Sequence, residues 1–203
     1  MTVVGVTGGI GSGKSAFVAR LSQHEGVRVI LADDLAKRLM VEDAAVRRQL
    51  VERFGPETYA ADGSLDRAAI ARRVFADPAE LAALNAIVHP AVRRGLTREM
   101  EAARASGVRV LVYEAALLLE TGGDAVVDQV VLIDAPVKVR VARAAARDGV
   151  SASDVRARMR HQIDPAEARQ QADRVVDNVG TLEALHAAAD QLAIDLGAGP
   201  RAV

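Results

Sequence analysis

The sequence predicts an α/β fold in which a parallel β-sheet is covered by helices on both faces. Short runs of apolar and β-branched residues alternate with longer amphipathic segments, and each run is nearly continuous in hydrophobic residues. Such runs are typical of strands buried on both faces, and their alternation with helices is typical of parallel sheets. The chain has 203 residues, enough for one sizeable core with a helical elaboration. We therefore expect a single domain over residues 1–203.

Five segments have the composition of buried strands, and together they predict a five-stranded parallel sheet. These are residues 3–7, 27–31, 108–113, 129–134 and 173–176. A helix is expected from Lys14, because Phe17, Val18 and Leu21 then share one face. The last helix is expected over residues 181–196, with Thr181 as its N-cap.

A long helical region rich in arginine and alanine is expected between the second and third strands, from about residue 34 to residue 106. It is interrupted over residues 54–66, where Gly55-Pro56 and Asp62-Gly63 are typical turn sequences. The chain contains no internal repeat and no low-complexity linker. The helical region is thus expected as an insert in the sheet-forming domain.

Composition argues against several classes of function. A net charge of −1 and only three Phe, two Tyr and no Trp disfavour nucleic-acid binding, which uses basic and stacking surfaces. No apolar run reaches the roughly 20 residues of a membrane span. No basic segment precedes an apolar one at the N-terminus, so no secretory signal is expected. The absence of cysteine fits a reducing cytoplasm, and we expect a cytoplasmic location. The oligomeric state does not follow from the sequence.

The glycine-rich segment after the first strand predicts a phosphate-binding loop (P-loop). Gly8, Gly13, Lys14 and Ser15 match G-x-x-x-x-G-K-[ST] between a predicted strand and a predicted helix. Backbone N–H groups can converge on phosphate oxygens only where no side chain intrudes, and the following helix adds unpaired N–H groups. In this motif the lysine reaches the β- and γ-phosphates of a nucleoside triphosphate, and the serine hydroxyl ligates Mg²⁺. The expected nucleotide-binding residues are Gly8, Gly9, Ile10, Gly11, Ser12, Gly13, Lys14, Ser15 and Ala16.

The loop alone does not specify the reaction, because GTPases, partitioning ATPases and small-molecule kinases share it. A GTPase needs an Asn-Lys-x-Asp base-reading motif, and none of the three lysines follows an asparagine. Large ATPases commonly end an apolar strand with Asp-Glu, whereas "VLIDA" and "LVYEA" each supply one acid. These absences favour a kinase. The alternatives are a kinase for another small molecule or a nucleoside monophosphate, and a regulatory ATPase that signals through a partner protein.

Asp33 is the candidate catalytic base. It follows the second predicted strand, and ligands in open parallel sheets bind beyond the carboxyl ends of the strands. A carboxylate there can accept the proton of an acceptor hydroxyl that attacks the γ-phosphate. The alternative is that Asp33 or Asp34 caps the next helix, as Asp often does. We assign the base to Asp33 and the cap to Asp34.

The chain resembles the dephospho-coenzyme A kinase family along nearly its whole length. The resemblance rests on "VTGGIGSGKS" (6–15), "VILADDLAKRL" (29–39), "ADGSLDR" (61–67), "LNAIVHP" (84–90), "ALLLE" (116–120), "RAAARDG" (143–149), "RMRHQ" (158–162) and "ADRVVDNVG" (172–180). It implies a P-loop NTPase-type three-layer fold and ATP-dependent phosphorylation of the ribose 3′-hydroxyl of dephospho-coenzyme A, the last step of coenzyme A synthesis. The implied partners are ATP and dephospho-coenzyme A, with Mg²⁺ as cofactor.

The resemblance also implies a division of the chain and further site residues. The core comprises residues 1–33, 107–137 and 166–196, the acceptor-binding helical region 34–106 and the lid 138–165. The composition of the last residues, 197–203, separately predicts a frayed tail. The family's catalytic carboxylate falls on Asp33. Leu31, Ala16 and Ala116 stand where the family commonly has Asp, Thr and Pro.

Two lid arginines and two acceptor-side residues complete the predicted site. Arg143 and Arg147 are four residues apart, so they share a helical face and can neutralise charge on the transferring phosphoryl group. The alternative for this pair is a solvated arginine face. His89 and Arg158 are assigned to acceptor binding, although a structural histidine and a surface arginine are the simpler interpretations. Asp177 and Asn178 end the last strand near the expected adenine pocket.

Overall fold

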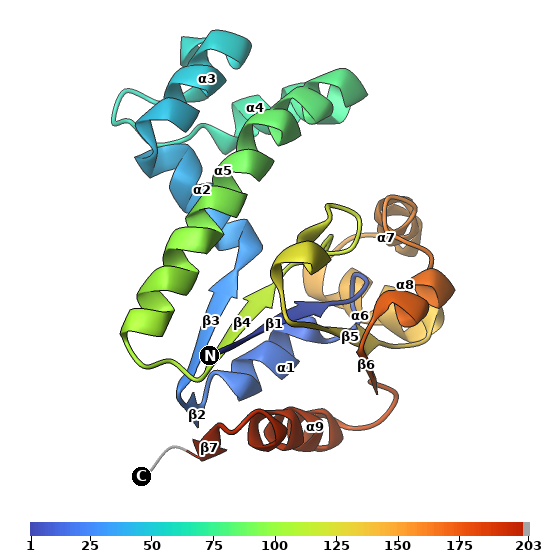
Figure 1. Cartoon of the computed structure of the whole chain (residues 1–203). Helices are drawn as coiled ribbons and strands as arrows, with labels where there is room; N and C mark the ends of the chain where they lie inside the picture. Colours follow the sequence, from blue (N-terminus) through green and yellow to red (C-terminus); the bar gives the residue numbers. More distant parts are fainter. Residues whose placement is uncertain (201–203) are drawn as a thin grey trace. The chain divides into compact units, whose positions relative to one another are not determined.

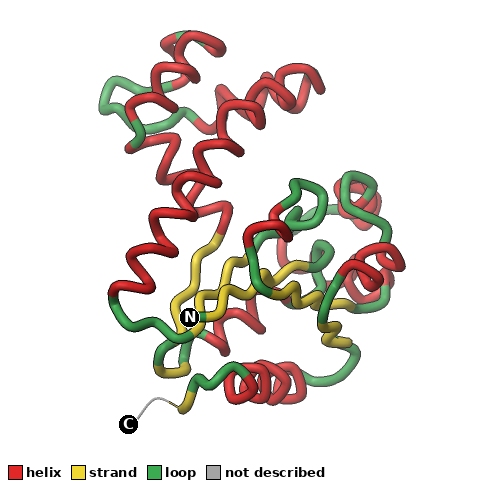
Figure 2. The backbone as a smooth tube through the Cα atoms, in the orientation of Figure 1, coloured by secondary structure: helices red, strands yellow, loops and turns green. Residues whose placement is uncertain are grey.

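The structure, a computed structural model, describes residues 1–200 and divides the chain into two compact units. The first unit comprises Met1–Leu31 and the chain from Ala103 onward, and the second comprises Ala32–Ala102. Figure 2 shows that the strands of the main sheet lie in the first unit, whereas the second unit is built mainly of helices. Each unit is described separately below.

A five-stranded sheet forms the centre of the first unit (Figure 1). In the order β3-β4-β1-β5-β6, the strands are Val27–Leu31, Val110–Glu114, Thr2–Thr7, Gln129–Asp134 and Arg174–Asp177. Every neighbouring pair is parallel, which confirms the predicted fold class. The register places Leu31 and Val6 opposite the same residue, Glu114, so β3 and β1 reach the same edge of the sheet.

Five helices of the first unit follow the strands: α1 (Lys14–Leu21), α6 (Val137–Asp148), α7 (Ala152–Met159), α8 (Pro165–Gln171) and α9 (Leu182–Asp195), together with the short 3₁₀ helix η2 (Gly123–Val126). The predicted N-cap is confirmed, because the Thr181 hydroxyl accepts a hydrogen bond from the N–H of Ala184. Ser151 and Asp154 form a reciprocal capping box at the start of α7.

The main hydrophobic core lies between the sheet and the helices α1 and α9. Phe17, Val18 and Leu21 are buried on one face of α1, as the sequence predicts. They pack with Val131 and Ile133 of β5, with other inward-facing strand residues and with the buried face of α9. Burying each large apolar side chain contributes about 1.5–3 kcal/mol, so this core fixes the sheet beneath the glycine-rich loop.

The second unit contains α2 (Ala32–Glu42), α3 (Ala44–Phe54), η1 (Pro56–Thr58), α4 (Arg67–Ala76) and α5 (Pro78–Ala105), and the predicted interruption near residues 54–66 is present. Asp43 caps α3 by accepting hydrogen bonds from the N–H groups of Ala45 and Val46. The side chains Val46, Leu50 and Phe54 are buried on α3.

Two sequence-based expectations are wrong. Asp34 does not cap α2, because the helix begins at Ala32 directly after β3 and Asp34 lies inside its first turn, where its carboxylate pairs with Lys37 at 2.8 Å. The chain from residue 197 is not a frayed tail throughout. Gly199–Pro200 forms the short strand β7, which pairs antiparallel with β2 (His24–Glu25), and both strands were too short to predict. Residues 201–203 of the expected tail lie outside the described residues.

Candidate active site

The glycine-rich loop joins the end of β1 to the start of α1, where a phosphate-binding loop is expected. Gly11 and Gly13 have φ of 76° and 104°, a left-handed region that other residues rarely adopt. A Cβ atom at Gly11 would lie 2.9 Å from the carbonyl carbon of Arg140, and one at Gly13 would collide with the side-chain amide of Asn178. Glycine is therefore required at both positions by conformation and by space.

The loop presents backbone donors at the N-terminus of α1. Gly13 is the N-cap and has no side chain to accept from the first-turn N–H groups, so these donors and the helix dipole favour an anion. The ammonium group of Lys14 folds back over the loop and donates to the carbonyl of Gly8 at 2.6 Å. Ser15 is exposed, whereas Ser12 is fully buried.

Two side chains from distant segments brace the loop. The buried amide of Asn178 donates to the carbonyl of Ser12 at 2.7 Å. The Gln162 side chain accepts from the N–H of Ile10 at 2.9 Å. The sequence placed Asn178 only near the expected adenine pocket and Gln162 only within the expected lid segment, but both side chains contact loop backbone. Their sequence signal was weak, because an isolated amide residue does not indicate which backbone it will contact.

A pocket opens beside the first residues of the loop. Its lining combines loop backbone, the segment after β4, the end of β5 and the starts of α6 and α8, namely Thr7, Gly8, Gly9, Ala116, Leu119, Glu120, Leu132, Asp134, Arg140, Gln162, Ile163, Pro165 and Ala168. Glu120 accepts a hydrogen bond from the N–H of Ile163 at 2.8 Å, which ties the segment after β4 to the segment before α8. All of these residues belong to the first unit.

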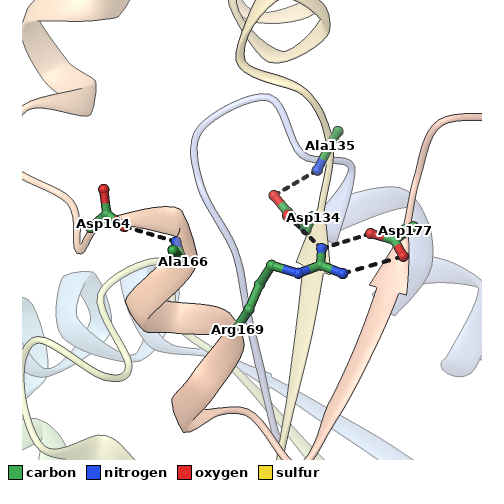
Figure 3. A network of polar contacts seen from close by, with 6 residues as sticks. All are labelled: Asp134, Ala135, Asp164, Ala166, Arg169 and Asp177. Atoms are coloured by element: carbon green, nitrogen blue, oxygen red, sulfur yellow. Dashed lines mark hydrogen bonds and ion pairs between the residues drawn. The ribbon is translucent and has the colours of Figure 1, made fainter.

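An ion-pair network fixes one wall of this pocket. Figure 3 shows Arg169 of α8 reaching Asp134 and Asp177, which end the adjacent strands β5 and β6. The guanidinium Nη1 lies 2.8 Å from Asp134 and 2.7 Å from Asp177. Arg169 lowers the pKa of Asp177, and these carboxylates in turn raise the pKa of Arg169. Ionised at neutral pH, the network anchors α8 to the sheet. Figure 3 also shows Asp164 capping α8 through the N–H of Ala166.

Arg140 is a pocket residue that sequence reasoning missed. It is 6% exposed and lies in the first turn of α6, and its guanidinium occupies the space where Gly9 lacks a Cβ. Burial lowers the pKa of Arg140, and the nearby charge of Asp134 opposes this change. In the same arginine-rich helix, spacing favoured Arg143 and Arg147 as the residues that neutralise phosphate charge. Nothing in the spacing distinguishes a buried arginine from an exposed one.

Arg143 and Arg147 occupy different environments on α6. Arg143 is half-buried, and its Nη1 lies 3.5 Å from the carbonyl of Asn178, the residue that braces the loop. Arg147 is exposed and pairs with Asp148 at 2.7 Å, and Arg158 of α7 pairs with the same carboxylate at 3.0 Å. Arg147 and then Arg158 lower the pKa of Asp148. Arg143 is thus beside the loop, whereas Arg147 and Arg158 are joined at the α6–α7 junction.

The comparisons with known proteins agree with this geometry. A family model described as dephospho-CoA kinase matches residues 2–184. The chain belongs to the dephospho-CoA kinase family. A dephospho-CoA kinase of Salinibacter ruber is 48% identical over 185 residues, covering 91% of this chain and 92% of that protein. One of Corynebacterium diphtheriae is 42% identical over 192 residues, covering 95% and 96%. The crystal structure of TT1252 from Thermus thermophilus has a TM-score of 0.78 and 39% identity, covering 96% of this chain and 97% of that one.

The remaining predicted residues belong to the helical unit of this family member. Asp33 is exposed in the first turn of α2, two residues beyond the end of β3. His89 lies inside α5 just before Pro90, and partial burial together with Arg93 lowers the pKa of His89. The structure therefore gathers the loop, Arg143 and the residues that brace the loop in one unit, and it places Asp33 and His89 in the other.

Within residues 1–200, no helix combines the length and hydrophobicity that a membrane span requires. No group of three or more His, Cys, Asp or Glu side chains there is arranged to hold a metal ion.

Proposed function

We propose that this chain transfers the γ-phosphoryl group of ATP to the ribose 3′-hydroxyl of dephospho-coenzyme A, with Asp33 as the catalytic base. Membership of the dephospho-CoA kinase family carries the reaction itself, the ATP-dependent phosphorylation of dephospho-CoA in coenzyme A synthesis. The choice of hydroxyl and the roles of individual residues are the proposal. The observation that carries it is a braced phosphate loop between β1 and α1 in a chain of this family.

The donor site is the loop with the cations near it. Loop residues Gly8–Ala16 would bind the phosphate chain through backbone N–H groups, and Lys14 would reach its β- and γ-phosphates. Arg143 supports this assignment because it is half-buried next to Asn178, which holds the loop. Arg147 would have to exchange its bond with Asp148 for one with phosphate, so we assign it to a later, closed arrangement of a lid formed by residues 138–165.

Magnesium fits the residues present. The exposed Ser15 hydroxyl lies at the start of α1, one residue after the lysine of the motif, and an oxygen ligand of this kind suits Mg²⁺. We propose that Ser15 would hold the ion together with phosphate oxygens and water. When bound, Mg²⁺ would supply neutralisation of negative charge on the phosphates.

The acceptor side is assigned from strand register and chain continuity. β3 and β1 reach the same edge of the sheet, and Asp33 is two residues beyond β3 while the loop begins directly after β1. An ionised carboxylate at that edge can accept the proton of the ribose hydroxyl as its oxygen attacks phosphorus. We assign the helical region 34–106 to acceptor binding, with contacts to dephospho-CoA from His89 and from Arg158 in the lid.

The test measures ADP release with four acceptors offered separately: dephospho-CoA, shikimate, AMP and CMP. Among the four acceptors, we expect only dephospho-CoA to support ADP release. Proton and phosphorus NMR of the product should place the new phosphate on the 3′-oxygen. Turnover with AMP or CMP in preference to dephospho-CoA would contradict the substrate. A phosphate on the 2′-oxygen would contradict the position while leaving the family reaction intact.

A further inference from the structure

Ile10 is the one bulky residue between Gly8 and Gly13 of the phosphate loop. Every other residue of this segment is glycine or serine. Small residues suit a loop whose backbone approaches phosphate, so a branched apolar side chain among them needs a separate explanation. The Ile10 side chain is half-buried and packs against a small apolar cluster outside the loop. The side chain thus makes a contact within the protein.

The apolar cluster that Ile10 joins is the core of the hairpin formed by α6 and α7. Its buried members are Val141 and Ala144 of α6 and Val155 of α7. The other half-buried residues packed against it come from the same two helices and the turn between them, namely Ala145, Val150 and Met159. Ile10 is therefore the contribution of the phosphate loop to the core of the hairpin.

The loop backbone is attached to the hairpin at two neighbouring points. The N–H of Ile10 donates to Oε1 of Gln162, just after the end of α7, at 2.9 Å. At Gly11 the backbone lies so close to the carbonyl group of Arg140, in the first turn of α6, that a Cβ atom has no room. The side chain of Ile10 and the backbone beside it thus fix the loop to α6 and to the end of α7.

Arg143 belongs to the part of α6 that Ile10 anchors. It lies between Val141 and Ala144 in the sequence, and both of these residues are members of the cluster. Its Nη1 lies 3.5 Å from the carbonyl of Asn178. The helical turn that carries Arg143 is therefore joined to the loop through the cluster.

We propose that Ile10 is a positioning residue that sets where Arg143 stands relative to the phosphate loop. The proposal rests on the proposed function, in which Arg143 neutralises charge on the transferring phosphoryl group, and it names the residue that places this arginine. Such catalysis depends on placement, because a displacement of about 1 Å can cost about 100-fold in rate. Shortening Ile10 would let the hairpin shift while every proposed phosphate-binding side chain remains present.

The competing explanation is that Ile10 only stabilises the fold. Both explanations predict a lower Tm when the side chain is shortened, because apolar contacts are lost in either case. They differ in the dependence on Arg143. A positioning residue that acts through Arg143 has little further effect once the arginine is gone, whereas the effects of independent sites multiply.

The test is a double-mutant cycle with Ile10→Ala and Arg143→Ala, in which ADP release is measured at saturating ATP and dephospho-CoA. We expect Ile10→Ala alone to lower kcat about tenfold, and to lower it less than about twofold further when Arg143 is already alanine. The Kd for ADP, measured by calorimetry, should change less than about threefold, because ADP lacks the group that is transferred. Ile10→Val keeps a branched side chain and should retain most of kcat.

Leu196→Ala is the matched control for stability. Leu196 is half-buried against the main core, and this change removes as many carbon atoms as Ile10→Ala does. It should lower Tm to a similar extent and leave kcat unchanged. Gln162→Met removes the acceptor for the N–H of Ile10, so it should show the same dependence on Arg143 and provides the test if Ile10→Ala does not fold.

Three results would overturn the inference while leaving the proposed function intact. These are full kcat in Ile10→Ala, equal fractional losses with and without Arg143, and a loss of kcat in Leu196→Ala as large as that in Ile10→Ala. An unchanged kcat in Arg143→Ala alone would contradict the proposed role of Arg143, and the inference about Ile10 would fail with it.

Discussion

The residues around the phosphate loop are buried or hydrogen-bonded, whereas the candidate base in the helical unit is exposed. Around the loop, Ser12 is fully buried, Gly13 is pressed against Asn178, and amide side chains from two other segments hold the backbone. In the helical unit, Asp33 is exposed in the first turn of α2. The difference shows that the backbone of the loop is held in place by contacts within the protein, as the proposed phosphate binding by fixed N–H groups requires. On the proposed assignment, the exposed carboxylate of Asp33 remains accessible to the acceptor substrate.

Among changes around the loop, the largest expected effect comes from adding a Cβ atom at Gly13. Gly13→Ala adds a Cβ against Asn178 and forces a non-glycine residue to a φ of 104°, so the N–H groups can no longer converge. We expect kcat/KM for ATP to fall at least 100-fold, about 3 kcal/mol, when ADP release is measured at saturating dephospho-CoA.

Gly107→Ala is the matched control for this change. Gly107 also has a positive φ, 73°, but no atom lies within 4 Å of an added Cβ. It should lower the free energy of unfolding by about 1 kcal/mol and leave kinetics unchanged. If Gly13→Ala keeps full activity as Gly107→Ala does, ATP binding does not require glycine at position 13 of the loop.

A smaller effect is expected when the brace of the loop is removed. Asn178→Ala deletes the amide that donates to the Ser12 carbonyl, and it leaves a buried acceptor unsatisfied. The cost of such a group is about 1–3 kcal/mol, and we expect most of it as an increase of about tenfold or more in KM for ATP. The KM for dephospho-CoA should change little. A selective rise in the KM for dephospho-CoA would instead place Asn178 on the acceptor side.

In the helical unit, a cap should affect stability but not nucleotide binding. Asp43→Ala removes the acceptor for two N–H groups at the start of α3. We expect the free energy of unfolding, measured by urea titration, to fall by about 1 kcal/mol. The affinity for ATP should match that of the unmodified chain within error. A large loss of ATP affinity would show that nucleotide binding also depends on the helical unit.

The smallest expected effect is on the pH dependence of stability, through the ion-pair network in Figure 3. Arg169 lowers the pKa of Asp177 below its unfolded value, so this pair stabilises the fold above that value, near pH 4, and the contribution is lost as pH falls through the lowered pKa. Both side chains are substantially exposed, at 42% and 58%, which keeps the effect small. Tm should therefore fall less between pH 6 and pH 3 in Arg169→Met than in the unmodified chain. Parallel pH profiles would show that the pair contributes nothing.

The sequence predicted what depends on local patterns. Continuous apolar runs identified the five parallel strands, and the glycine spacing identified the loop and the start of α1. The assignment of Asp34 as a cap failed because α2 continues directly from β3 without a capping residue. Arg140 and the bracing role of Asn178 were missed because burial and partners arise from segments far apart in the chain, which periodicity does not report.

The most direct test of the proposed chemistry compares Asp33→Asn with Asp34→Asn. The two residues are adjacent in the first turn of α2, so both changes remove one charge from the same exposed turn. With dephospho-CoA and ATP saturating, we expect Asp33→Asn to lower kcat by about 10²- to 10⁴-fold with ATP affinity unchanged, the range of a general base. Asp34→Asn should stay within about twofold of the unmodified chain. Near-normal turnover in Asp33→Asn would contradict the assignment of Asp33 as the base.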